Sequence, residues 1–173
     1  YFNISNNMTV GNIQGQISYA GVFDTNRYID INNGAATTDP SFSAYPSTAQ
    51  AVSTAFIKIL IDTKEFDTAT CFDPTTNYRF TPTVAGYYQF NLTVNTQNTA
   101  TVLYCSLYKN GTNFKLNSVP DGPASGVNVS AVIYMNGSTD YIELYCYQNS
   151  GGSISIQGAS YWTYFSAALV RSA

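Results

Sequence analysis

Hydrophobic and polar residues alternate along most of the chain, from about Ala55 to the C-terminus. The clearest example runs from Val127 to Met135, where an apolar residue occupies every second position. Successive side chains of a β-strand point to opposite faces of its sheet, so this alternation predicts strands with one buried face. No window of helical length carries apolar residues at positions i, i+3, i+4 and i+7. The chain is therefore predicted to be all-β.

Turn residues separate the predicted strands. Asn110-Gly111 and Asn136-Gly137 each lie between two alternating segments. Asn-Gly is the strongest short signal for a β-hairpin, because both central residues of a type I′ turn have positive φ. Short strands joined by Gly, Pro, Asn and Ser turns favour a sandwich of two sheets. The residues expected in its core are Ile57, Ile59, Phe80, Tyr88, Phe90, Leu103, Leu107, Ile133, Leu144, Phe165 and Leu169.

Residues 1–39 have a different character. They contain Asn-rich and Gly-punctuated pieces around short apolar alternations such as Ile13 to Ile17. Such a segment is typical of an extended neck or leader that becomes ordered only against neighbouring chains. We therefore predict a neck at residues 1–39 and one head domain at residues 40–173. The chain is long enough to bury a core without a disulfide or a metal ion.

The segment from Tyr78 to Leu92 resembles the core signature of C1q-like domains, which are trimeric jelly rolls related to tumour necrosis factor (TNF). In that signature Phe, five residues, Gly, one residue, Tyr, one residue and Phe follow in this order. Here these positions are Phe80, Gly86, Tyr88 and Phe90. Leu92 stands in the place of the family's next aromatic residue.

The resemblance extends over about residues 40–173. Leu107 to Gly111 is similar to the K-N-G hairpin of the family, and Phe165 to Leu169 is similar to its closing strand. Asp73 stands where the family has an aromatic residue or Leu, and Phe72 lies one position earlier. This departure implies a one-residue insertion in a loop. The resemblance implies a C1q/TNF-like jelly-roll sandwich of two antiparallel sheets that forms trimers.

Charged residues make up only 10% of the chain, and the net charge is −3. The basic residues are scattered, which argues against nucleic acid as a partner, because phosphate binding needs clustered Lys or Arg. No apolar stretch approaches the roughly 20 residues of a membrane span, so membrane insertion is not expected. The chain has no histidine, which excludes Ser-His-Asp and Cys-His nucleophilic sites. We expect a protein that is not an enzyme and has no catalytic residues.

The chain has three cysteines. Cys105 and Cys146 are in phase with apolar neighbours, so both are expected to point into the core. Two buried free thiols are favoured over a disulfide, because free Cys is among the most buried residue types. Cys71 lies in a predicted loop and is expected to be exposed.

Four acidic residues fall within one short stretch of the chain: Asp62, Glu65, Asp67 and Asp73. Carboxylates in such a loop region are usually solvated, and this is the favoured interpretation. A glycosidase could use two of them. Ca²⁺ binding fits the stretch better, because hard cations take clustered carboxylates and carbonyl groups in loops. The sequence thus leaves Ca²⁺ as the one candidate cofactor.

Seven tyrosines alternate out of phase with the core positions: Tyr87, Tyr104, Tyr108, Tyr134, Tyr141, Tyr145 and Tyr147. Aromatic side chains on an outer face favour association, because monomers rarely expose so much contiguous apolar surface. The resemblance implies where they would meet, since one sheet of each C1q-like subunit faces the threefold axis. We therefore predict a trimer interface at these tyrosines. A surface that stacks carbohydrate is the alternative, and Tyr87 and Tyr134 could instead belong to a second layer of the core.

A longer phrase, Asp62 to Thr68 followed by Phe72 to Phe90, resembles the C-terminal domains of bacteriophage tail and fibre proteins. It implies an extracellular virion protein whose homotrimeric head serves host attachment by binding a receptor, either a surface polysaccharide or an outer-membrane protein. The loops expected to make contact are residues 95–101, 117–127 and 148–155. Two alternatives remain, namely a capsid decoration or assembly protein that acts only through trimerisation, and a secreted eukaryotic C1q-like recognition protein.

Overall fold

The computed structural model describes residues 39–119 and 124–173, which belong to a compact unit spanning residues 35–173. These residues form thirteen strands and no helix. Accordingly, the described part of the chain contains no helix able to span a membrane. The predicted neck, residues 1–39, lies outside the described residues except for Asp39, and it remains a prediction.

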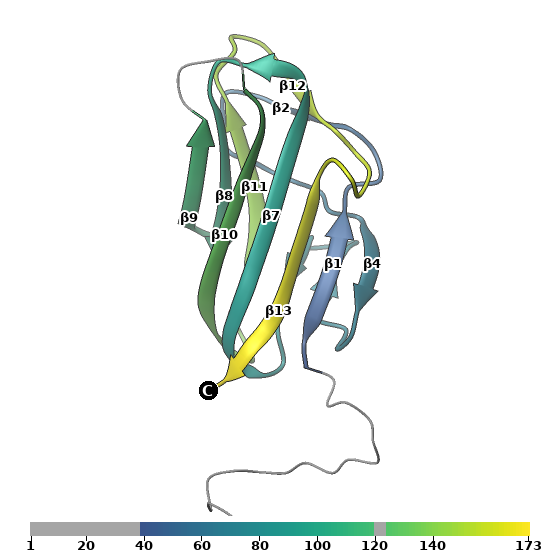
Figure 1. The fold of residues 1–173 in the computed structure, drawn as a ribbon, viewed down its shortest axis with the longest axis vertical. Coiled ribbons are helices and arrows are strands. Elements are labelled where there is room, and N and C mark those ends of the chain that lie inside the picture. Colours follow the sequence, from purple (N-terminus) through teal and green to yellow (C-terminus); the bar gives the residue numbers. More distant parts are fainter. Residues whose placement is uncertain (1–38, 120–123) are drawn as a thin grey trace, which may run out of the picture. The chain divides into compact units, whose positions relative to one another are not determined.

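The strands form two sheets in which every pairing is antiparallel (Figure 1). The seven-stranded sheet contains β1 (Ser41–Tyr45), β2 (Gln50–Val52), β4 (Thr63–Asp67), β7 (Ala85–Ala100), β10 (Ala124–Asn136), β12 (Ile154–Ile156) and β13 (Tyr164–Ser172). The six-stranded sheet contains β3 (Ile57–Lys58), β5 (Phe72–Asp73), β6 (Arg79–Phe80), β8 (Leu103–Lys109), β9 (Thr112–Val119) and β11 (Ile142–Gln148). The predicted two-sheet jelly-roll sandwich is confirmed.

The strand β7 organises the seven-stranded sheet. Its sixteen residues pair with β10 along one edge, and with β13 and then β12 along the other. Its even-numbered side chains from Tyr88 to Val94 are buried, whereas Tyr87 and Asn91 are exposed. The alternation that predicted the strand therefore also divides its residues between the core and the outer face.

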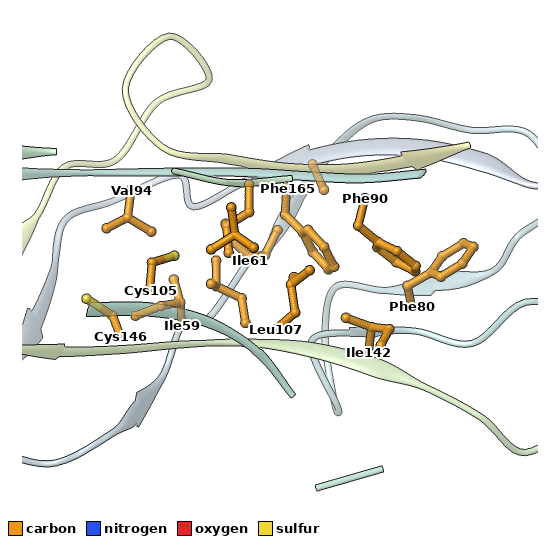
Figure 2. Packing of buried hydrophobic residues seen from close by; sticks show 14 of the residues in the cluster. Ile59, Ile61, Phe80, Phe90, Val94, Cys105, Leu107, Ile142, Cys146 and Phe165 are labelled. Carbon is orange, nitrogen blue, oxygen red and sulfur yellow. The ribbon is translucent and has the colours of Figure 1, made fainter. Parts of the chain in front are cut away.

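The core between the sheets is centred on aromatic rings. Phe42 stacks on Phe72 and Phe80, with ring centroids 4.6 and 4.8 Å apart, and its edge meets Phe165 at 4.9 Å. Figure 2 shows Phe80, Phe90 and Phe165 among the aliphatic side chains that fill the space between the sheets. Phe72 thus occupies the core although it lies one position away from the family's pattern.

The predicted core residues are confirmed, except that two are only partly buried: Ile57 and Leu169 pack against the core from its margin. Leu169 also explains the glycine of the signature. A Cβ atom at Gly86 would collide with the backbone oxygen of Arg171 and with Cδ1 of Leu169, because β13 crosses close to the start of β7. The pairing of β13 with β7 is also irregular there, between Leu169 and Arg171.

The two Asn-Gly pairs have different structures. Asn110 and Gly111 both have positive φ, at 52° and 78°, and they join β8 to β9 as predicted. The hairpin predicted at Asn136-Gly137 is wrong, because β10 pairs with β7 whereas β11 pairs with β8 in the other sheet. The Oδ1 atom of Asn136 accepts hydrogen bonds from the backbone N–H groups of residues 138, 139 and 140, and this turn starts a crossing between the sheets.

The sandwich has two distinguishable ends, the base and the tip. At the base, Leu169 donates its backbone N–H to Pro40, and Ala173 donates to Ala85, so β1 starts where β13 ends (Figure 1). At the tip, Ala100 pairs with Ala124, and Leu103 pairs with both Val119 and Gln148. These two ends define where a neck and contact loops can attach.

The carboxylate of Asp140 connects two loops at the base. Its Oδ1 accepts a hydrogen bond from Asn110 Nδ2 at 2.8 Å, and its Oδ2 accepts one from the backbone N–H of Asn136 at 3.0 Å. Lys109 Nζ forms an ion pair with Oδ2 at 2.9 Å. Burial raises the pKa of Asp140, but the hydrogen bonds from Asn110, Lys109 and Asn136 outweigh it and hold the pKa below its ordinary value of 3.8.

The substitution Phe42→Ala should destabilise the fold by about 3–5 kcal/mol, because it leaves a cavity among three aromatic rings. The half-exposed Phe114 is the matched control, and Phe114→Ala should cost less than about 1 kcal/mol. Denaturant unfolding at one fixed protein concentration measures both changes. Equal losses for the two variants would contradict the aromatic centre of the core.

The substitution Asp140→Asn should flatten the dependence of stability on pH. Because the folded pKa is depressed, the stabilisation by the carboxylate is present above about pH 4 and is lost as the pH falls through the folded pKa. The parent protein should therefore lose more free energy of unfolding than the variant between about pH 6 and about pH 3. Denaturant unfolding at a series of pH values provides the measurement, and parallel profiles would show that Asp140 is not linked to stability.

Candidate functional site

The seven tyrosines of the predicted interface lie on both sheets. Tyr87 is in β7 and Tyr134 is in β10, so both belong to the seven-stranded sheet. The other five lie in or next to strands of the six-stranded sheet: Tyr104, Tyr108, Tyr141, Tyr145 and Tyr147. A sandwich has one outer face on each sheet, and no single sheet face holds all seven. The sequence pattern finds outward positions, but it does not tell to which sheet they belong.

The first surface is the outer face of β7, β10 and β13, which we call the β7 face. Toward the base it exposes apolar side chains, with Val132 53% and Val170 63% exposed. Tyr87 and Tyr134 are half exposed, and their ring centroids are 5.5 Å apart. Neither tyrosine forms a second layer of the core. This part of the face is apolar and lies next to the base.

Further toward the tip, the β7 face carries a polar network. Gln89 Nε2 donates to Ser130 Oγ at 2.8 Å, and Ser130 Oγ donates to Asn91 Oδ1 at 3.0 Å. These side chains therefore satisfy one another across two strands. Covering them would cost little, because a polar group is expensive to bury only when it loses its hydrogen bonds.

The β7 face has almost no charge. The outward positions of β7, β10 and β13 contain no Asp, Glu or Lys, and the one charged residue is Arg171, which is exposed opposite Tyr87 near the base. Lys109 approaches from the neighbouring sheet, where it donates to the backbone oxygen of Tyr134 at 2.7 Å and is paired with Asp140. A partner that covered this face away from Arg171 would have no unpaired charge to desolvate.

The second surface is an aromatic patch on the outer face of the six-stranded sheet, formed by Phe56, Tyr104, Tyr108, Tyr145 and Tyr147. Phe56 lies over the sheet, with its ring centroid 5.4 Å from that of Tyr147 and 6.0 Å from that of Tyr108. Tyr104 and Tyr147 are directly paired across β8 and β11, at 5.4 Å. Tyr108 stacks on Tyr145 at 4.0 Å. The rings hold one another in place.

A hollow of about 310 Å³ opens at one side of this patch. It is lined by Phe56, Tyr104, Asn113, Leu116, Tyr147 and Asn149. The hollow lies toward the tip, since Leu103 and Gln148 pair there. Sequence reasoning identified the two tyrosines, and its predicted contact loop 148–155 includes Asn149. It missed the other three residues, because they come from the loop before β3 and from β9.

The four acidic residues do not gather around a point. Within residues 39–119 and 124–173, no group of three or more His, Cys, Asp or Glu side chains is arranged to hold a metal ion. Each carboxylate is used by its own neighbourhood instead. Asp62 accepts hydrogen bonds from Ser47, Glu65 from Ser43, and Asp67 from the backbone of residues 71 and 72.

Asp73 also has a local role. Its Oδ1 accepts hydrogen bonds from the backbone N–H groups of Thr75 and Thr76, and its Oδ2 accepts one from that of Asn77. These bonds close the turn between β5 and β6, and the backbone bonds of Thr76 and Thr75 hold the pKa of Asp73 well below its ordinary value. The carboxylate is thus a turn former.

The cysteines offer no nucleophile. Cys105 and Cys146 pair across β8 and β11 and point into the core as free thiols, as predicted (Figure 2). Burial raises the pKa of Cys146 to about 12 and that of Cys105 well above its ordinary value, so neither forms a reactive thiolate at neutral pH. The exposure expected for Cys71 is wrong: the loop residue is buried, because Asp67 draws its backbone N–H inward.

The described parts of the three predicted contact loops lie at the tip, although some of these residues are in strands. Residues 95–100 continue β7, residues 117–119 end β9, and residues 120–123 lie outside the described residues. Gln148 is fully buried and fixes the third loop, since its Oε1 accepts the backbone N–H of Ser150 at 2.6 Å. A separate aromatic pair, Tyr161 and Trp162, is exposed before β13 and was missed because no alternation surrounds it.

Comparison with known proteins supports the fold. No protein-family model matches the sequence, and no curated protein matches it either. Among solved structures, the globular domain of zebrafish complement 1qA aligns with a TM-score of 0.60 and 15% identity, over 78% of this chain and 99% of that one. The Eiger TNF from S. frugiperda gives a TM-score of 0.59 at 10% identity, over 78% and 92%. The PRD1 vertex protein P5 gives 0.60 at 17% identity, over 83% and 81%.

These identities are low, and the likeness concerns the arrangement of the strands. The chain has the C1q/TNF-like jelly-roll fold, as the signature around Phe80 and Gly86 implies. The same fold occurs in a complement protein, a TNF protein and a phage vertex protein. A shared fold does not determine function, so the surfaces described above must decide what this chain does.

Proposed function

We propose that this chain forms the homotrimeric head of a bacteriophage tail or fibre protein and attaches the virion to a receptor on the host cell surface. The observation that carries the proposal is the β7 face, an outer sheet face with almost no charge that combines exposed apolar side chains with a self-satisfied polar network. Such a face is unusual on a solvated monomer and suits contact with other copies of the same chain.

Three-fold association follows from the sequence resemblance together with the β7 face. The resemblance to C1q-like domains implies that one sheet of each subunit faces the threefold axis. The β7 face has the properties that this position requires, because three copies would bring identical side chains together. Identical charges there would repel one another, and the outward positions of β7, β10 and β13 contain no carboxylate or lysine.

The assignment to a virion is supported by two likenesses. The phrase from Asp62 to Phe90 resembles phage tail and fibre domains, and the fold is shared with a phage vertex protein. The geometry of the ends fits attachment: the described chain begins and ends at the base, whereas the tip carries the loops.

A trimer would also allow individually weak contacts to give strong binding to a surface. Three identical sites joined in one particle can bind a surface with an avidity about 10²–10⁴ times the affinity of one site. A polysaccharide or an array of outer-membrane proteins repeats the same binding partner, so the three sites of one trimer could bind it at the same time. The head therefore needs no deep, high-affinity pocket.

Trimer formation can be tested by light scattering over a range of protein concentrations. The protein should have a mass near three chains of 18.8 kDa. Val132→Glu should yield monomers, because it places three carboxylates on the apolar part of the β7 face. Leu60→Glu is the matched control, since Leu60 is similarly exposed, at 44% against 53% for Val132, but lies between β3 and β4. EDTA should leave the mass unchanged. A monomeric parent protein would disprove this interface.

Attachment can be tested separately with labelled protein and cells of the strain that propagates the virus. The head should bind these cells and reduce virion adsorption, and monomeric Val132→Glu should bind about 10²-fold more weakly because it loses avidity. A stable trimer that binds no cells would refute attachment and favour a decoration or assembly protein. Localisation of the protein outside virions would instead favour the secreted recognition protein.

A further inference from the structure

The hollow beside the aromatic patch has the form of a built binding site. Its floor and walls come from three parts of the six-stranded sheet, and the rings of Tyr104 and Tyr147 support each other at 5.4 Å. Its volume, about 310 Å³, is at the lower end of the roughly 300–1,000 Å³ found for small-molecule sites. It therefore suits a single small ring or one unit of a polymer.

Several polar groups that line the hollow have no hydrogen-bond partner within the described residues. Ser106, which is fully buried, donates its hydroxyl to Asn113 Oδ1 at 2.9 Å and so holds that amide in place. Within the described residues, the Nδ2 group of Asn113 and the side chain of Asn149 have no hydrogen-bond partner, nor do the hydroxyls of Tyr104 and Tyr147. The hollow thus presents donors and acceptors next to aromatic carbon.

Charge excludes ionic ligands. None of the six lining residues is charged. Lys58 and Glu143 on the same sheet pair with each other at 2.6 Å between β3 and β11. A charged ligand would lose its hydration without gaining an opposite charge, whereas a neutral ligand would not pay this cost. The electrostatics therefore match an uncharged, hydroxyl-rich molecule.

We propose that this hollow binds a neutral hexopyranose unit of a glycan. A pyranose ring has an apolar face of C–H groups that packs on aromatic rings and a rim of hydroxyls that exchange hydrogen bonds with amides and phenols. The aromatic patch and the two free amides provide these complementary groups. The proposal rests on the proposed function only for the source of the sugar, which would be the host surface, since the hollow lies toward the tip.

The position of Asn149 is fixed by the fold. Gln148 is buried and donates from Nε2 to the backbone oxygen of Val52 at 3.1 Å, while its Oε1 accepts from Ser150. Thr101 donates its backbone N–H to Ser150 Oγ at 3.1 Å. The loop after β11 is thereby tied to β2 and to the turn after β7. The backbone that carries Asn149 therefore needs little ordering when a ligand binds.

The test uses the intact chain and methyl glycosides of glucose, galactose, mannose and N-acetylglucosamine as probes, with methyl glucuronide as the charged analogue. Saturation-transfer NMR and titration should detect at least one neutral glycoside with a Kd of roughly 1 mM, a value common for weak single sites. The glucuronide should bind more weakly. The absence of any signal from the neutral glycosides at about 50 mM would overturn the proposal.

Variants locate the site. Tyr147→Ala and Asn149→Ala should each weaken binding by about tenfold or more. Tyr141→Ala is the control, because Tyr141 lies next to the same sheet, against Arg79, but outside the hollow, and it should leave affinity unchanged. Asn149 is in an exposed loop, so its variant keeps the test decisive even if Tyr147→Ala fails to fold. Unchanged binding in Asn149→Ala and in a folded Tyr147→Ala would overturn the assignment.

If the hollow binds something other than a sugar, the same experiments would give different results. If a proline-rich peptide binds at the hollow and no sugar does, the hollow is a peptide site instead. A change of mass in Tyr147→Ala would show a contact between copies, and either result refutes the proposal. Monomeric Val132→Glu should retain sugar binding, because the hollow lies within one chain. Sugar binding without trimers or cell attachment would refute the proposed function alone, and cell attachment without sugar binding would refute this inference alone.

Discussion

The alternation along β7 is the constraint on which the rest of the molecule depends. Its inward side chains, among them Tyr88 and Phe90, pack on the aromatic centre of the core. Its outward side chains Tyr87, Gln89 and Asn91 form part of the β7 face. A one-residue slip of this strand would exchange the two sets. The close approach of β13 at Gly86 helps to hold the register, since only a residue without Cβ fits there. Core packing and the proposed association surface are therefore two results of one pairing.

Most of the fold follows from local sequence features, because alternation and the Asn110-Gly111 turn depend on residues close in the chain. The failures concern features that neither strand alternation nor an Asn-Gly pair reveals, such as side-chain hydrogen bonds to nearby backbone groups. Asn136-Gly137 has the sequence of a hairpin, yet the side chain of Asn136 forms a turn that sends the chain to the other sheet. Cys71 is buried because Asp67 binds its backbone. Phe42, the centre of the core, lies in a short strand whose alternation is too brief to identify it.

The candidate surfaces were predictable only in part. Alternation correctly separated outward tyrosines from core positions, but the assignment of each to a sheet depends on the pairing of β10 with β7 and of β11 with β8. The hollow required Phe56, Asn113 and Asn149 to meet from three separate segments, and such a meeting leaves no trace in sequence spacing. The acidic stretch shows the converse case, in which residues close in sequence have separate roles in turns and strand pairs.

The division of the tyrosines between two sheets has a physical consequence for recognition. The outer faces of a two-sheet sandwich point in opposite directions, so association through the β7 face leaves the aromatic patch uncovered. Three hollows would then be distributed around the trimer, each toward the tip and each held by contacts within its own subunit. Weak binding of single sugar units would suffice there, because simultaneous contact multiplies it by avidity. The low charge of the chain fits both proposals, since a neutral glycan or a contact over most of the β7 face would remove little water from unpaired ions.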